Sequence, residues 1–298
     1  MQKLQRSAPI GVFDSGIGGL SVANAISGLL PRESLLYVAD NARAPYGPQS
    51  AAAIIAYSRE IARFLLARRA KLIVVACNTA TSLAIDVLRA EFPEVPFVGL
   101  EPAVKPAREG EKIGILATAA TLNSPRYQAL KARFLPGKLV LEDACRGLVP
   151  IIESAGPGSQ PLRNMLSEIL TPMLRRDIDT LVLGCTHYPV VKEDIAAICG
   201  PQVNIIDPSA AAARQVVRIL NKHALSLPPG NSPGEQAAIT QEDIMPLPNT
   251  APGPYPSTCG PAHDFYCSGA SVPLQRTLFN LPALNQQRRF IVPHYKLG

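Results

Sequence analysis

The sequence predicts an α/β fold of two similar domains, each a mainly parallel sheet flanked by helices and related by a pseudo-twofold axis. Over the first two hundred residues, short β-branched apolar runs alternate with longer helical patterns, which is typical of parallel sheets covered by helices. The segments LIVVACNTAT at 72–81 and LVLGCTHYPV at 181–190 form a weak internal repeat, since each leads from an apolar strand into a cysteine. A chain of 298 residues is long enough for two domains of ordinary size.

Eight short apolar runs are expected to be buried strands. They are Pro9–Asp14, Ser34–Asp40, Lys71–Cys77, Val95–Gly99, Lys112–Thr118, Leu139–Leu141, Asp179–Cys185 and Val203–Asp207. The clearest helices between them are predicted over Ser50–Arg69 and Pro161–Arg176, where apolar residues recur at three- and four-residue spacing.

The first domain is expected to be discontinuous, with residues 1–100 and 208–298, and the second to span 101–207. The segment EPAVKPA at 101–107 has two prolines after a strand and suits a crossover, and IDPSAAA at 206–212 suits the return path.

A proline-rich stretch from Ser226 to Pro261 contains nine prolines and little periodicity, which predicts an extended segment. After it, HDFYCSGASVPLQRTLF at 263–279 is expected to form a closing strand and helix that rejoin the first domain.

Composition excludes several classes of function. The net charge of +6 comes from lysines and arginines scattered over predicted helices without interleaved aromatic residues, so solvated helix faces are favoured over nucleic-acid binding. No apolar run reaches about 18 residues, and the start MQKLQRSAPIGVFD lacks the apolar stretch of a secretory signal. The six cysteines include no CxxC pair, so a disulfide framework is not expected. We therefore expect a cytoplasmic protein with reduced thiols that binds neither membrane nor nucleic acid.

Polar clusters follow the predicted strands. In an open parallel sheet, ligands bind at the carboxyl ends of the strands, where helix N-termini favour anions. Four such clusters are expected to point toward one cleft: Asp14-Ser15 with the turn Gly16–Gly19, then Ala44–Gly47, Cys77-Asn78-Thr79 and Cys185-Thr186-His187.

The glycine turn DSGIGG after the first strand matches neither GxGxxG nor the P-loop pattern, and no lysine follows where phosphates would need one. Nucleotide binding is therefore disfavoured. The interpretation is that these glycines let the backbone approach a small carboxylate closely.

The thiols of Cys77 and Cys185 are the candidate reactive groups. A buried cysteine is usually an inert small hydrophobe, but each of these thiols lies where a helix N-terminus is expected to lower its pKa. Hydroxyl or amide side chains that could hold a carboxylate follow both. Two cysteines in equivalent positions suggest two thiol bases that act as a pair.

His187 could be a base partner or orienting residue for Cys185, and Asp14 could play the same part for Cys77. A zinc site is disfavoured, because Cys145, Cys185, His187 and Cys199 lack the spacing of a zinc finger. The cysteines at 145, 199, 259 and 267 are interpreted as structural.

Seven motifs occur in the order found in a known family. They are GVFDSGIGGLSV, YVADNARAPYG, ACNTAT, GLEPAVKPA, ILATAAT, LGCTHYP and IDPSA, over residues 11–210. On these motifs the chain resembles the glutamate racemases of the aspartate/glutamate racemase superfamily. The resemblance implies an active site between the two domains, with Cys77 and Cys185 as the acid/base residues and Asp14 and His187 assisting them.

The resemblance also implies a substrate pocket, with glutamate as the substrate. The pocket residues would be Asp14, Ser15, Pro45, Tyr46, Gly47, Asn78, Thr79, Thr118, Thr121 and Thr186. It further implies a homodimer without cofactor or metal that supplies D-glutamate for peptidoglycan. Pyridoxal phosphate is not expected, because no lysine lies at a comparable position.

Two departures from the family pattern are visible. Where the family commonly has a Cys-Pro pair, this chain has Cys145-Arg146-Gly147, followed by VPIIE, which leaves an accessory role for Glu153 open. The proline-rich stretch also makes the C-terminal third a poorer match. The alternatives are an aspartate racemase or related isomerase, and a non-catalytic protein that binds a dicarboxylate.

Overall fold

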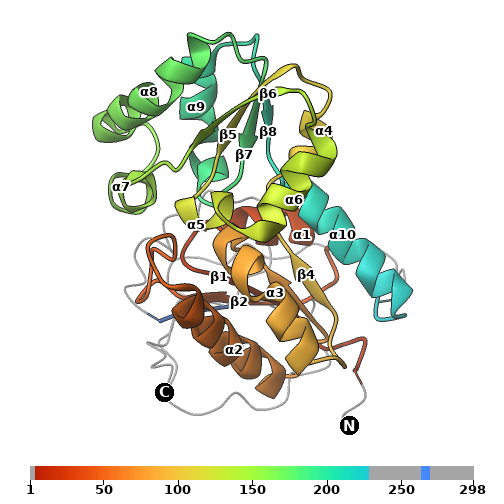
Figure 1. Ribbon diagram of the computed structural model, residues 1–298. Coiled ribbons are helices and arrows are strands. Elements are labelled where there is room, and N and C mark those ends of the chain that lie inside the picture. Colours follow the sequence, from red (N-terminus) through yellow and green to blue (C-terminus); the bar gives the residue numbers. More distant parts are fainter. Residues whose placement is uncertain (1–3, 228–262, 269–298) are drawn as a thin grey trace.

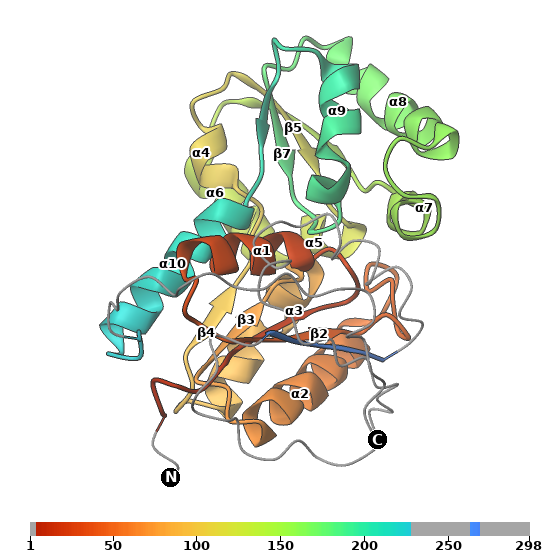
Figure 2. The same ribbon diagram turned by 180° about the vertical axis from the view of Figure 1, so that it is seen from behind.

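The chain folds into two parallel sheets with helices on both faces of each, arranged as two lobes (Figures 1 and 2). The computed structural model describes residues 4–227 and 263–268. Every strand pair in this part of the chain is parallel. The predicted α/β class with two sheets is therefore confirmed.

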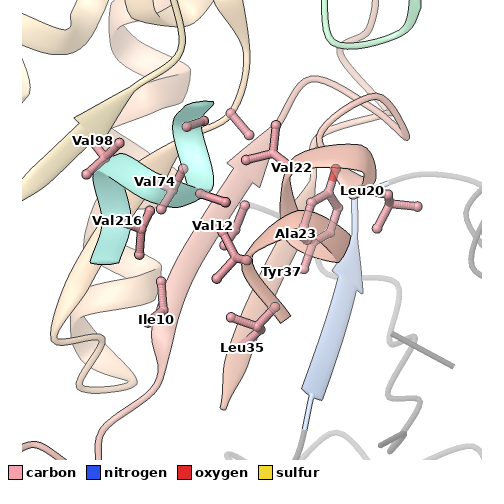
Figure 3. Close-up of a cluster of buried hydrophobic side chains, with 14 of the residues drawn as sticks. Ile10, Val12, Leu20, Val22, Ala23, Leu35, Tyr37, Val74, Val98 and Val216 are labelled. Carbon is pink, nitrogen blue, oxygen red and sulfur yellow. The ribbon is translucent and has the colours of Figure 1, made fainter. Parts of the chain in front are cut away.

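The first sheet has the strand order β4-β3-β1-β2-β9. Its strands are β1 (Ile10–Asp14), β2 (Leu35–Ala39), β3 (Leu72–Val75), β4 (Phe97–Gly99) and β9 (His263–Cys267). One face packs against α1 (Leu20–Leu29) and α10 (Ser209–Lys222), and the other against α2 (Ala51–Ala67) and α3 (Asn78–Glu91). Figure 3 shows the first of these cores, where Val12 and Val74 of the sheet meet Ala23 of α1 and Val216 of α10.

Helix α2 illustrates why these residues form these elements. The hydroxyl of Ser50 accepts a hydrogen bond from the backbone N–H of Ala53 and so caps the helix. Ile54, Ile61 and Leu65 then recur at helical spacing and are buried against the sheet.

The second sheet has the order β6-β5-β7-β8. Its strands are β5 (Lys112–Leu116), β6 (Leu139–Asp143), β7 (Thr180–Leu183) and β8 (Asn204–Ile206). The helices around it are α4 (Val104–Ala107), α5 (Ala119–Leu122), α6 (Pro125–Phe134), α7 (Leu148–Ala155), α8 (Gln160–Leu174) and α9 (Lys192–Cys199), with a 3-10 turn at Tyr188–Val191. Two apolar clusters pack on opposite faces of this sheet, one beneath α4 and α6 and the other beneath α7, α8 and α9.

All eight predicted strands are present, and most are a residue or more shorter than expected. The run at Lys71–Cys77 ends as a strand at Val75, because Cys77 is already the N-cap residue of α3. Conversely, β6 continues to Asp143, two residues beyond its predicted end. Both predicted helices are confirmed as α2 and α8.

The closing strand is also confirmed, since β9 pairs in parallel with β2 at the edge of the first sheet. The helix expected after it, most of the proline-rich stretch and Cys259 lie outside the described residues. The domain boundaries at residues 100 and 207 stay a prediction. No helix of the described ranges is long and apolar enough for a membrane span.

Candidate active site

Cys77 and Cys185 come from different sheets and occupy equivalent places in them. Cys77 follows β3 and precedes α3, and Cys185 follows β7 just before the 3-10 turn. Both thiols are buried, with 4% and 6% of the residue exposed, and both are free. The Cys185 sulfur is close enough to contribute to the raised pKa of Cys77. The fold therefore brings two thiols from separate halves of the chain to one place.

The surroundings of Cys77 are neutral or negative. Burial raises the pKa of its thiol to about 12, and the carboxylate of Asp14 adds to the increase. The backbone N–H of Ala80 and the hydroxyl of Ser15, whose Oγ lies 3.8 Å from the sulfur, act in the opposite direction. The expectation that a helix N-terminus lowers this pKa is therefore wrong for Cys77, because desolvation outweighs the helix amides.

Cys185 instead lies beside an imidazole. Its sulfur is 3.9 Å from Nδ1 of His187, and Nε2 of His187 is 2.8 Å from Oε1 of Glu153. Burial by itself would lower the pKa of His187, but the Cys185 and Glu153 partners outweigh it and raise this pKa well above its ordinary value. Burial likewise raises the pKa of Glu153, but the bond to His187 outweighs it and the net shift is downward. These shifts favour an imidazolium–carboxylate pair next to the thiol.

Asp14 is bound from both lobes and does not contact Cys77 through a hydrogen bond. Its Oδ2 accepts from the backbone N–H of Gly16 at 2.9 Å, and its Oδ1 accepts from the hydroxyl of Thr186 at 3.0 Å. Asp14 and Thr186 are both fully buried. Asp14 therefore acts on Cys77 through its charge, and it ties β1 to the segment that carries Cys185.

The glycine turn after β1 packs directly against the second lobe. A Cβ placed at Gly16 would lie 2.1 Å from Oε1 of Glu153, and one at Gly18 would lie 2.7 Å from the backbone nitrogen of His187. The backbone N–H of Ile17 also donates to Glu153 at 3.4 Å. The side chain of Glu153 is thus one carboxylate that approaches these glycines. That the turn also admits a ligand carboxylate stays a prediction.

Hydroxyl and amide groups meet between the sheets near Cys77. Oγ1 of Thr79 is 2.8 Å from Oγ1 of Thr118, which is 3.1 Å from Oγ1 of Thr121. The amide of Asn78 donates to the carbonyl of Leu100 at 3.1 Å, and its buried Oδ1 has no hydrogen-bond partner within the described residues. An unpaired acceptor in a buried position is suited to a donor group of a ligand.

The loop after β2 brings Pro45, Tyr46 and Gly47 to the same region. The Ala44–Pro45 peptide bond is cis, and a Cβ at Gly47 would lie 3.4 Å from Cβ of Thr118. Tyr46 is buried, and its hydroxyl donates to Oδ2 of Asp40 at 2.5 Å. The Tyr46 hydroxyl is therefore already committed to the protein, which leaves the backbone of this loop to face a ligand.

The other cysteines that the structure describes, Cys145, Cys199 and Cys267, are buried and free. No group of three or more His, Cys, Asp or Glu side chains in residues 4–227 and 263–268 is placed to hold a metal ion.

The sequence leaves the role of Glu153 open and gives no signal for Asp40. In the structure Glu153 contacts His187, and Asp40 binds the hydroxyl of Tyr46. The aspartate in YVADNARAPYG lies six residues before the tyrosine, and no helix or strand period pairs them.

Comparison with known proteins identifies the family of this chain. A model of the Asp/Glu/Hydantoin racemase family matches residues 19–216. The chain belongs to the Asp/Glu/Hydantoin racemase family. Among its relatives, the glutamate racemase of Pseudomonas paraeruginosa is 50% identical over 223 residues, which is 74% of this chain and 84% of that protein. The glutamate racemase of Herpetosiphon aurantiacus is 44% identical and covers 80% of this chain and 94% of its own length.

Solved structures of glutamate racemases resemble almost the whole chain. The Francisella tularensis enzyme in complex with D-glutamate has a TM-score of 0.75 at 28% identity, covering 98% of this chain and 99% of its own. The Escherichia coli enzyme in complex with L-glutamate and the activator UDP-MurNAc-ala has a TM-score of 0.74 at 29% identity, with 96% and 98% covered.

Proposed function

We propose that this chain is a glutamate racemase that interconverts L- and D-glutamate and supplies D-glutamate for peptidoglycan. Relatives 44–50% identical over most of their length are glutamate racemases, and solved structures of such enzymes match nearly the whole chain. The observation that carries the proposal is the pair of buried free thiols delivered by two different sheets. Racemisation by two bases needs one proton carrier on each face of the α-carbon, because a proton leaves one face and another arrives on the opposite face.

The two thiols begin the reaction in different states. With L-glutamate, the thiolate of Cys185 removes the α-proton and the thiol of Cys77 donates a proton to the other face. Nδ1 of His187, whose pKa is raised, lies 3.9 Å from the Cys185 sulfur, and the raised pKa of about 12 keeps Cys77 protonated at neutral pH. With D-glutamate the roles are reversed. Glu153 assists by holding the proton on His187.

Bound glutamate would lower the pKa of the Cys77 thiol. The positively charged α-ammonium group of the substrate, once bound near Asp14 and the free acceptor Oδ1 of Asn78, opposes the desolvation that raises the pKa of Cys77. Ser15, Thr79, Thr118, Thr121, Thr186 and the Pro45–Gly47 backbone would complete the pocket around the two carboxylates. The thiolate form of Cys77 thus becomes accessible in the substrate complex.

Isotope exchange tests the two-base mechanism directly. In deuterium oxide the Cys77 thiol exchanges with solvent, so D-glutamate formed from L-glutamate should carry deuterium while the remaining L-glutamate does not. Proton NMR of the separated enantiomers at low conversion measures both. Substantial unlabelled D-glutamate, or early label in the recovered substrate, would exclude Cys77 and Cys185 as independent bases.

Activity measurements separate the proposal from its alternatives. Circular dichroism should follow the loss of optical activity with either enantiomer of glutamate and no added cofactor. Chelators and carbonyl reagents should leave the rate unchanged, whereas thiol alkylation should abolish it and glutamate should protect. Faster turnover of aspartate would make the chain an aspartate racemase, and glutamate binding without α-proton exchange would make it a binding protein.

The assembly and location are part of the same proposal. A homodimer in the cytoplasm fits an enzyme with free buried thiols that acts on a free amino acid. Sedimentation equilibrium tests the dimer, and a monomer at micromolar concentration with full activity would contradict it.

A further inference from the structure

A buried carboxylate lies behind the loop that faces the cleft. Asp40 follows β2 directly and has no exposed surface. Its Oδ2 accepts from the Tyr46 hydroxyl at 2.5 Å and from Nε of Arg43 at 2.7 Å, and its Oδ1 accepts from the hydroxyl of Ser268 at 2.7 Å. A buried charge is retained only when partners compensate its desolvation. Here the compensating partners are Arg43 and Tyr46, which belong to the loop after β2, and Ser268, which is distant in the sequence.

The same network ties the loop to two other elements of the first lobe. Nη1 of Arg43 binds Glu60 of α2 at 2.6 Å, and its guanidinium lies 4.1 Å from the centre of the Tyr57 ring on the same helix. The hydroxyl of Ser268 also accepts from the backbone N–H of Ala42 at 3.0 Å. The loop is therefore bound to α2 on one side and to the end of β9 on the other.

The far end of this loop reaches the residues proposed to bind glutamate. Gly47 abuts Thr118, where an added Cβ would come within 3.4 Å of the threonine side chain. Oγ1 of Thr118 in turn lies 2.8 Å from Oγ1 of Thr79, next to Cys77. A displacement of the loop would change the width of the pocket at this point, whereas the hydrogen-bond partners of the two thiols, Ser15 and His187, lie on other segments.

We propose that Asp40 and Ser268 are positioning residues for substrate binding, which act by fixing the loop 44–47 through Tyr46 and Ala42. The proposal rests on the glutamate racemase function. It assigns a task to the residue that directly follows β9, the strand that returns to the first sheet after the long segment 228–262. Neither residue touches the thiols. Their contribution is made equally in the substrate complex and the transition state, so it belongs in KM and not in kcat.

The test compares the steady-state kinetics of Tyr46→Phe and Ser268→Ala with those of the wild-type chain. Tyr46→Phe removes one hydrogen bond to Asp40, and Ser268→Ala removes one to Asp40 and one from the backbone N–H of Ala42. Each change should raise KM for both enantiomers about tenfold, the size expected for one lost bond to a charged acceptor, with kcat within about twofold. Ser268→Thr, which keeps the hydroxyl, should restore the wild-type KM.

Tyr127→Phe is the matched control. Tyr127 is equally buried and its hydroxyl also binds a carboxylate, that of Glu142, but it lies on α6 under the second sheet. This variant should lose stability without any change in KM. An equal rise in KM for Tyr127→Phe would show that the effect is a general loosening of the fold, and would overturn the proposal.

A double variant tests whether Asp40 is the shared link. Because both single changes act through one carboxylate, Tyr46→Phe combined with Ser268→Ala should raise KM by clearly less than the product of the two single effects. A fully multiplicative rise would reject the shared link. Unchanged KM in a folded Tyr46→Phe chain would overturn the proposal even if Ser268→Ala fails to fold.

The wild-type measurement in the same experiment keeps the two proposals separate. A wild-type chain that does not racemise glutamate rejects the proposed function and this inference with it. A wild-type chain that does racemise glutamate, combined with variants of normal KM, rejects only the positioning role.

Discussion

The two thiol sites are alike in their place in the fold and unlike in their surroundings. Each cysteine ends the connection from a parallel strand to the next helical turn, and each is buried. Cys77, however, has a hydroxyl at 3.8 Å and the charge of Asp14 nearby, whereas Cys185 has an imidazole at 3.9 Å that is itself bound to Glu153. Similar backbones thus carry two thiols in different electrostatic surroundings. In the proposed mechanism one cysteine donates a proton while the other accepts one, and the difference in surroundings suits that division.

The largest expected effect comes from deleting either thiol. Cys77→Ala and Cys185→Ala should each lower the rate of racemisation by about a thousandfold or more, because each removes one of two obligatory proton carriers. Cys199→Ala is the control, as this cysteine is also buried but lies at the end of α9. Near-normal turnover in either active-site variant, measured by circular dichroism with both enantiomers, would show that the two-base assignment is wrong.

Removal of the Glu153 charge should make the two sites more alike. The pKa of His187 is raised because its Cys185 and Glu153 partners outweigh burial, so Glu153→Gln should lower this pKa. The imidazolium then loses its proton at a lower pH, and the alkaline limb of the kcat profile should move to lower pH by about one unit, with kcat on that limb reduced by up to about tenfold.

Glu142→Gln serves as the control for this experiment, because the Glu142 carboxylate also binds a buried ring side chain, that of Tyr127, but lies on β6 away from His187. Its pH profile should match that of the wild-type chain. An unshifted alkaline limb in Glu153→Gln would mean that Glu153 does not sustain the charge of His187.

Alkylation should reveal the difference between the sites before any substrate is added. A thiolate reacts and a thiol does not. Burial raises the pKa of Cys77 to about 12, so with iodoacetamide near pH 8 Cys77 should react about tenfold more slowly than Cys185, whose sulfur lies 3.9 Å from Nδ1 of His187. Peptide mass spectrometry over time gives both rates. Burial also raises the pKa of Cys145 and Cys199, so these should react slowly as internal references. Faster modification of Cys77 would reverse the assignment of acid and base in the free enzyme.

The smallest expected effect is at Ser15. Its hydroxyl lowers the pKa of Cys77 through a long contact of 3.8 Å, so Ser15→Ala should raise that pKa further. With D-glutamate, for which Cys77 is the base, kcat should fall about threefold. Ser226→Ala, which removes an exposed hydroxyl bonded to Asn221, should leave kcat unchanged. A fall much greater than threefold would give Ser15 a direct role in proton transfer.

The sequence motifs led to the elements of the site more reliably than to its contacts. The strand-to-cysteine pattern at 72–81 and 181–190 predicted both thiols at strand ends, since strand period and helix caps are local properties. The partnership of Asp14 with Thr186 spans 172 residues, and that of Asp40 with Ser268 spans 228. No local period connects such pairs, so they could not be read from the chain.

The sequence by itself determined the α/β class, eight strands in their order, the return of β9 and the family to which the chain belongs. Tertiary structure alone decided how each polar group is used. It placed Glu153 against the glycine turn, committed the Tyr46 hydroxyl to Asp40, and raised the pKa of Cys77 where a helix N-terminus had suggested the opposite. The physical reason is that hydrophobic pattern and backbone preference are set by near neighbours, whereas desolvation and charge depend on every group that folding brings within a few ångströms.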